Sequence, residues 1–310
     1  MSSDVLTKQR IQPWQATVCL FVCAYLALGL ATNSLRAYHG LMVLAIPGAL
    51  LSGERGRRFF VDWAPLFVFW LVYDRLRLVQ SLLYSRVAVE EPFLIERAAF
   101  GWLAKGDVPA HAAHAWISSH TGTMATALEW TAQLVYFSHL FVAPAVIATL
   151  WVFGLSRGRC RAAFVEFLRA FTVLNFAAIV VYLLAPVAPP WWVTLNGMAR
   201  PTAELVAHVD MAAGMHGILI QGMIRNASQW FAAVPSLHGA YPVLLLLLGL
   251  RRRSLWALAA ISAYGCLMWG ATVVLNQHYI IDLLAGAILS ILAWRTARSP
   301  GFERIIRIGL

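Results

Sequence analysis

Two short segments in the last third of the chain place ionisable side chains among apolar residues. The first reads VPSLHGAYP at positions 234–242, and the second reads NQHYIIDLLAG at positions 276–286. In the second segment His278 and Asp282 are four residues apart, so on a helix they share one face. The carboxylate can then accept a hydrogen bond from one imidazole nitrogen while the other nitrogen points outward. This arrangement orients a histidine as a nucleophile or a base.

The first segment provides a second histidine at the start of a predicted helix. Pro235 and Ser236 are residue types that open helices, and a helix N-terminus attracts anions through its N–H groups and its dipole. We therefore predict that the imidazoles of His238 and His278 hold a phosphate between them. Groups that act on one phosphorus have to lie within about 10 Å of each other.

The composition indicates which elements position these residues. Of the 310 residues, 60% are hydrophobic and 12% are charged, and the mean hydropathy is +0.69. A soluble protein has about twice that density of charge. The sequence therefore predicts an all-α, polytopic integral membrane helical bundle, and it excludes a disordered tail, a coiled coil and a secreted disulfide scaffold. The 4 cysteines show no disulfide or metal-binding spacing. We expect no metal, and no cofactor either.

About eight stretches approach the roughly 20 apolar residues that a membrane-spanning helix needs. They lie at 14–31, 35–52, 59–77, 126–153, 163–186, 235–250, 255–275 and 278–295. Pro47 and Gly48 interrupt the second stretch. His238 and His278 begin the sixth and eighth stretches, so two crossings separate them and both belong on the same face of the membrane.

The basic residues predict the orientation. With a cytoplasmic N-terminus, 15 of the 24 Lys and Arg residues fall in cytoplasmic segments and 8 in much longer segments outside. We therefore predict that both termini are cytoplasmic and that the histidines face the other side. The outer segments, 78–125 and 187–234, have the tryptophans of interfacial helices. The net charge of +10 is spread over small groups beside apolar stretches, so we expect no nucleic-acid partner.

These motifs resemble those of the membrane branch of the type-2 phosphatidic acid phosphatase superfamily. The signature residues are Pro235, Ser236 and His238, followed by His278 and Asp282. Weaker features resemble the inositol phosphorylceramide synthase subgroup, namely Tyr136, Ser138 and His139, the APPW turn at 188–191, and Gly286. The resemblance covers residues 70–295. It implies a six-helix phosphatase-type core within a catalytic membrane domain at 59–310, preceded by N-terminal transmembrane helices at 1–58.

The resemblance also implies chemistry through a phosphohistidine, without a metal. His278 would attack phosphorus, Asp282 would hold the His278 tautomer, and His238 would protonate the departing oxygen and then activate the acceptor. The substrate-binding and phosphate-binding residues that it implies are Arg77, Arg75, Ser236, Gly239, His139, Tyr136 and Trp191. For His139 the alternative is packing between helices, and for Trp191 it is anchoring at the membrane interface.

Two phosphate-binding cations of the phosphatases have no counterpart in this chain. Phosphatase members carry a Lys-x6-Arg-Pro element, and a Ser-Arg pair where Ala271 and Thr272 stand here. Arg77 and Arg75 are the predicted substitutes, with headgroup anchoring as the alternative. A phosphodiester carries one negative charge and needs fewer cations than a terminal phosphate. This favours a phosphodiester substrate.

The favoured hypothesis is a membrane enzyme that transfers a phosphorylated head group, inositol phosphate or similar, from a phospholipid donor to a lipid hydroxyl acceptor. The first alternative is a lipid phosphatase that hydrolyses phosphatidate or polyprenyl phosphate, with water as acceptor. The second is a non-enzymatic transporter or scaffold, whose histidines would be staggered through the membrane thickness rather than gathered at one depth.

Overall fold

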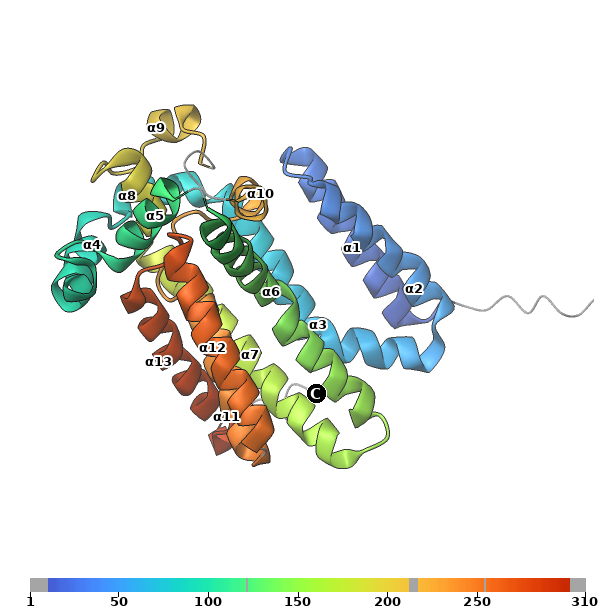
Figure 1. Cartoon of the computed structure of the whole chain (residues 1–310). Helices are drawn as coiled ribbons and strands as arrows, with labels where there is room; N and C mark the ends of the chain where they lie inside the picture. Colours follow the sequence, from blue (N-terminus) through green and yellow to red (C-terminus); the bar gives the residue numbers. More distant parts are fainter. Residues whose placement is uncertain (1–10, 121, 212–216, 254, 302–310) are drawn as a thin grey trace, which may run out of the picture. The chain divides into compact units, whose positions relative to one another are not determined.

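The computed structural model describes residues 11–120, 122–211, 217–253 and 255–301. This part of the chain is helical apart from two isolated β-bridges, which confirms the all-α prediction (Figure 1). Within it, five helices are long and apolar enough to cross a membrane, as expected of a multi-pass membrane protein. They are α1 (Pro13–Ala31), α6 (Thr123–Gly154), α7 (Gly158–Leu184), α12 (Leu255–Val274) and α13 (Ile280–Ala297). The number of eight crossings stays a prediction.

The other helices are shorter or more polar. Two of them overlap the predicted spans at 59–77 and 235–250: α3 (Gly53–Arg75) has 23 residues but includes several charges, and α11 (Leu237–Arg252) has 16 residues. The short α-helices are α2 (Ala45–Leu51), α4 (Glu90–Phe100), α5 (Pro109–Ser119), α8 (Pro190–Asn196), α9 (Ala203–His208) and α10 (Ile218–Asn226). The 3-10 helices are η1 (Ala37–Leu44), η2 (Leu76–Leu78), η3 (Gln80–Arg86) and η4 (Gly101–Ala104).

The chain divides into two compact units, Met1–Val68 and Phe69–Leu310. In the first unit, the stretch at 35–52, which Pro47 and Gly48 interrupt, is not a single spanning α-helix. The chain there forms η1 and then α2, because Pro47 lacks an N–H group and is tolerated only in the first turn of an α-helix. The side-chain amide of Gln15 on α1 donates to the carbonyl of Ala49 at 3.0 Å and so ties α1 to α2.

The second unit is built around long helices packed side by side. In Figure 1, α6, α7, α11, α12 and α13 run along one another. Helices α11 and α13 approach each other closely at two glycines. A β-carbon on Gly239 would lie 2.7 Å from the Leu283 backbone, and one on Gly286 would lie 2.1 Å from the Ser236 carbonyl oxygen. Glycine at both positions therefore lets the two helices that follow the histidine motifs touch through their backbones.

The predicted outer segments pack together at one end of this bundle. The short helices α4, α5, α8, α9 and α10 gather there in Figure 1. Val187 forms isolated parallel bridges with both Ala88 and Ala232, so three distant segments meet at this residue. Trp192 and Phe231 are fully buried between them, with ring centroids 5.1 Å apart. These segments thus share a hydrophobic core in addition to any contact with the membrane interface.

The opposite end of the bundle is basic. Glu166 on α7 lies 3.5 Å from Arg251 at the end of α11 and 2.7 Å from Arg298 just after α13. These arginines belong to the set predicted to face the cytoplasm. Of the same set, Lys8, Arg10, Arg304 and Arg307 lie outside the described residues.

Candidate active site

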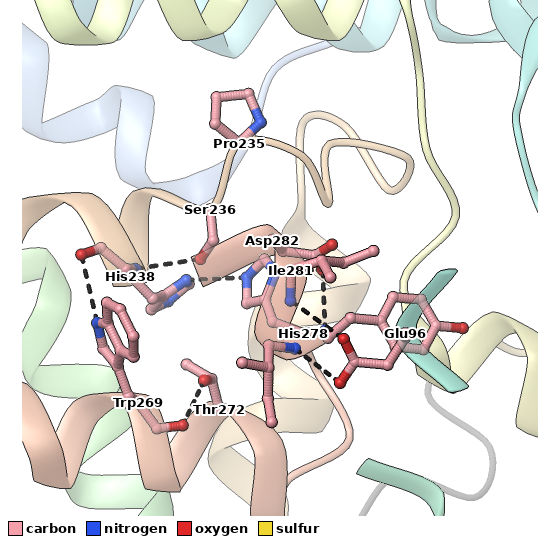
Figure 2. Close-up of polar contacts among 12 residues, drawn as sticks. Glu96, Pro235, Ser236, His238, Trp269, Thr272, His278, Ile281 and Asp282 are labelled. Carbon is pink, nitrogen blue, oxygen red and sulfur yellow. Dashed lines mark hydrogen bonds and ion pairs between the residues drawn. The ribbon is translucent and has the colours of Figure 1, made fainter. Parts of the chain in front are cut away.

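The structure brings the two motif histidines together (Figure 2). Nδ1 of His238 lies 3.2 Å from Nε2 of His278, and the two ring centroids are 5.2 Å apart. The other nitrogen of His278, Nδ1, lies 3.3 Å from the Asp282 carboxylate, which is completely buried. Because His278 uses Nδ1 toward the acid, Nε2 is the nitrogen available for nucleophilic attack.

His278 and Asp282 meet through a helix cap rather than on a shared helix face. The prediction of a helix that starts at residue 278 is wrong, since α13 begins at Ile280 and Tyr279 is its extended N-cap. Asp282 is the third residue of the helix, and its carboxylate accepts the Tyr279 N–H at 2.9 Å. The carbonyl of Thr272 accepts the N–H of Gln277 at 2.9 Å, which ties the turn before His278 to the end of α12.

Two aromatic residues one turn apart on α6 enclose the ring of His238. Tyr136 stacks on it at 4.0 Å between centroids and 20°, and His139 lies at 4.0 Å and 30°. His139 in turn stacks on Tyr241 at 4.6 Å and 7°. These contacts hold the plane of His238. Its buried Nε2 atom has no hydrogen-bond partner within the described part of the chain.

The histidine pair opens into a cavity of about 320 Å³. Its walls include Tyr73, Tyr136, His139, Tyr182, Trp191, Leu237, His238 and His278, together with the polar side chains of Asn226, Ser228, Gln229 and Gln277. Aromatic and apolar walls with a small number of polar groups are typical of a ligand-binding pocket. Of the predicted substrate residues, Tyr136, His139 and Trp191 lie in this wall.

The predicted arginines sit one layer behind the cavity. Arg77 donates from Nη2 to the hydroxyl of Ser228 at 3.1 Å, and Ser228 lines the cavity. Arg77 also pairs with the buried carboxylate of Asp74, and Nε of Arg75 lies 3.8 Å from the same group. Two cations around one anion leave a net charge of about +1 beside the cavity.

Ser236 and Gly239 are placed differently from the expectation that they bind phosphate. Ser236 is completely buried, and its hydroxyl accepts the Gly239 N–H at 3.2 Å as the N-cap of α11. The Ser236 N–H donates to the Asp282 carbonyl at 3.0 Å. Neither residue lines the cavity, whereas the first two residues of the helix, Leu237 and His238, do. The hydroxyl of the motif serine thus caps the helix that carries His238.

The sequence analysis missed Glu96, a completely buried residue of α4. Its two carboxylate oxygens accept the N–H groups of Ile280 at 3.0 Å and Ile281 at 3.1 Å (Figure 2). The pKa of the Glu96 carboxyl is raised above its usual value, first by burial and then by the charge of Asp282. The two N–H hydrogen bonds offset part of this rise. The signal in the sequence was a glutamate three residues after Phe93, on the apolar face of a short amphipathic helix.

Other polar contacts of the site could not be recognised in advance. The hydroxyl of Tyr182 on α7 donates to the carbonyl of Pro235 at 2.8 Å and supports the start of α11. Gln277 directly precedes His278 and lines the cavity. Tyrosines in apolar helices are common, so neither residue type carries a specific signal. In the described part of the chain, no three His, Cys, Asp or Glu side chains gather as a metal site.

Comparison with known families places this site in a wider group. A family model described as the PAP2 superfamily matches residues 102–296, which is more than half of the chain. The chain belongs to the PAP2 superfamily. The match includes both histidine motifs, and it confirms the resemblance to the phosphatidic acid phosphatases. No solved structure matches the chain.

The similar curated proteins in this superfamily are lipid synthases. A phosphoinositol dihydroceramide synthase of Bacteroides thetaiotaomicron is 26% identical over 284 residues, which cover 90% of this chain and 89% of that protein. The inositol phosphorylceramide synthase of Candida albicans is 27% identical over 168 residues, 51% of this chain and 32% of the fungal protein. The inositol phosphorylceramide synthase catalytic subunit of Saccharomyces cerevisiae is 28% identical over 127 residues, 38% of this chain and 30% of that protein. This PAP2 protein is thus a membrane enzyme that acts on lipids.

Proposed function

We propose that this enzyme transfers a phosphorylated polyol head group, inositol phosphate or a close relative, from a phospholipid to the hydroxyl of a ceramide-type lipid. The observation that carries the proposal is the pairing of His238 and His278 at 3.2 Å, with Asp282 on the far nitrogen of His278, at the wall of a cavity. The names of the similar proteins, a phosphoinositol dihydroceramide synthase and an inositol phosphorylceramide synthase, support the choice of head group and acceptor.

The first half of the reaction forms a phosphohistidine. The lone pair on Nε2 of His278 attacks the phosphorus, and the bond from phosphorus to the glycerol oxygen breaks. That oxygen takes the electron pair and a proton from His238, so neutral diacylglycerol leaves. Asp282 accepts from Nδ1 of His278 and stabilises the positive charge that the ring acquires.

The second half reverses these roles. His238 now removes the proton from the acceptor hydroxyl, whose oxygen attacks the phosphorus as the P–N bond breaks. The electron pair of that bond returns to Nε2 of His278, and both histidines regain their starting states. Because Tyr136 and His139 both pack closely on the His238 ring, its nitrogens stay in the plane needed for both proton transfers.

The charges near the cavity favour a phosphodiester over a terminal phosphate. The net charge of about +1 from Arg75, Arg77 and Asp74 matches a phosphodiester, which carries one negative charge. Arg77 reaches the cavity wall through Ser228 and would stabilise the equatorial oxygens of the transition state. In this proposal Asp74 neutralises one of the two arginine charges, and the second positive charge that a dianionic terminal phosphate would require is therefore missing.

The proposal includes an orientation in the membrane. The basic end of the bundle, with Arg251 and Arg298, faces the cytoplasm, and the histidine pair at the other end opens to the outer leaflet. Both termini are then cytoplasmic.

The test is a transfer assay with purified enzyme and phosphatidylinositol labelled with ³²P in its phosphate. We expect label in a new lipid only when ceramide or dihydroceramide is present. Label in water-soluble inositol phosphate, independent of added acceptor, would indicate hydrolysis and contradict the transfer. Labelled phosphatidate, supplied separately, tests the phosphatase alternative, for which free phosphate would be the product.

A further inference from the structure

Glu96 binds the first turn of the helix that carries Asp282. Its carboxylate accepts the Ile280 and Ile281 N–H groups, which are the first two of α13, while Asp282 accepts the N–H of the N-cap residue Tyr279. Helix N-termini leave such N–H groups without helical partners. Three successive N–H groups in this turn are therefore bound by just two carboxylates, one from the helix itself and one from α4.

The surroundings of Glu96 indicate that these two bonds are its task. In the described part of the chain, no Lys or Arg lies within 4.0 Å of the Glu96 carboxylate, although the side chain is completely buried. A buried carboxylate is unfavourable unless hydrogen bonds and a helix dipole compensate it. Only a carboxylate offers two acceptor oxygens without a donor, whereas a glutamine offers one. Glu96 also does not line the cavity, so it has no direct contact with substrate there.

The turn that Glu96 holds determines where His278 points. His278 lies two residues before Ile280, and its Nδ1 meets the carboxylate of the third helical residue, Asp282. A shift of this turn relative to α4 would carry both residues with it, while His238 on α11 stays in its aromatic enclosure. The 3.2 Å contact between the two histidines would then be lost.

We propose that Glu96 is a positioning residue for the catalytic histidine pair: it anchors the start of α13 so that Nε2 of His278 stays aimed at His238. The effect of Glu96 on kcat rests on the proposed function, whereas its anchoring of α13 does not. Glu96 is 184 residues from Ile280 in the sequence, so α4 contributes to catalysis from outside the two histidine motifs.

Two substitutions remove the contact from opposite sides. Glu96→Gln keeps the shape of the side chain but places a donor group against one N–H. Ile280→Pro removes one N–H instead, at the first helical position, where proline is tolerated. Tyr279 has φ −74° and ψ 158°, a conformation that a following proline permits. The matched controls are Ile280→Ala, which keeps the N–H, and Glu91→Gln, an exposed glutamate on the same helix.

The kinetic measurement is transfer in mixed micelles with kcat and KM for the donor determined separately. We expect Glu96→Gln and Ile280→Pro each to lower kcat by about tenfold to a hundredfold, the range caused by small displacements of a catalytic group. KM should change less than about twofold, because the cavity wall is intact. The kcat of the double variant should lie within about twofold of the kcat of the slower single variant, since both substitutions remove the same contact. The two controls should keep the kcat of the wild type.

The second measurement does not depend on activity. Hydrogen–deuterium exchange of the Ile280 and Ile281 amides should become about tenfold faster in Glu96→Gln, while exchange in the middle of α13 stays unchanged. Glu96→Asp has a side chain too short to reach both amides, so exchange of these amides should become faster to a similar degree. This variant replaces Glu96→Gln in the test if Glu96→Gln does not fold. Unchanged exchange would overturn the anchoring, and faster exchange with unchanged kcat would overturn the positioning role. If wild-type enzyme transferred no head group, the proposed function would fail while the exchange result still tested the anchor.

Discussion

Gly286→Ala tests whether the histidines meet because α11 and α13 pack through their backbones. A β-carbon at position 286 would lie 2.1 Å from the Ser236 carbonyl oxygen and 3.1 Å from the Ala240 nitrogen. Contacts of a β-carbon essentially never fall under 3.0 Å, so the helices have to separate by 0.9 Å or more along the shorter contact. Both contact atoms belong to the backbone, and no side-chain rotation can absorb the clash.

The expected effects follow from this displacement. Forcing an extra methyl group into a packed interior costs about 1–3 kcal/mol, which should lower the melting temperature by several degrees. Ser236 caps α11, whose second residue is His238, so the shift moves one histidine away from the other. A displacement on the order of 1 Å in a catalytic group can lower the rate about 10²-fold. We therefore expect kcat to fall by about that factor.

The assay compares Gly286→Ala with a matched glycine substitution in the same bundle. Gly270→Ala on α12 is the control, because nothing lies within 4 Å of its added β-carbon. Alanine has a higher helix propensity than glycine by about 1 kcal/mol, so this control should be as stable as wild type or more stable. Transfer rates at saturating donor and thermal unfolding in the same detergent give both quantities. A Gly286→Ala enzyme with wild-type kcat and melting temperature would refute the close packing of α11 on α13.

Three further predictions address the site, the core and the orientation. His278→Ala should lower turnover by about 10⁴-fold or more while the protein stays folded in the membrane, with a lower melting temperature because the buried Asp282 carboxylate loses its His278 partner; retained turnover would remove His278 as the nucleophile. Tyr241→Phe should destabilise the fold by about 1–3 kcal/mol in chemical unfolding, because the buried Oδ1 of Asn175 loses its 2.6 Å hydrogen bond; an unchanged midpoint would contradict this. In cells carrying single-cysteine variants, a membrane-impermeant maleimide should label Trp102→Cys directly and Arg253→Cys only after permeabilisation, and the reverse pattern would invert the proposed orientation.

The helical segments could be predicted where apolarity was continuous. The predicted spans at 126–153, 163–186 and 255–275 agree with α6, α7 and α12 to within a few residues. Hydropathy carries this information because the hydrocarbon core sets both the length and the composition of a spanning helix. It was less informative at 35–52, where the apolar residues form first a 3-10 helix, Ala37–Leu44, and then a short α-helix that begins at Ala45, two residues before Pro47.

The start of α13 was a subtler error. Spacing by four placed His278 and Asp282 on one helix face, whereas the structure pairs them across an N-cap. The same four-residue separation suits both geometries, since the residue just before the N-cap, His278, also lies within reach of the third helical residue, Asp282. The motif therefore predicted the contact without predicting the conformation that makes it.

What the sequence by itself determined is the chemistry that the chain offers. It contains two histidines and an aspartate in recognisable motifs, enough apolar helix to enclose them in a membrane, and a clear excess of cations at one end. What only the tertiary structure decided is how those groups are aimed. Ser236 caps a helix, Asp74 offsets the arginines, and Glu96 holds the first turn of α13. Each of these contacts joins groups through backbone atoms or across helices, and such distances depend on packing that local residue patterns do not encode.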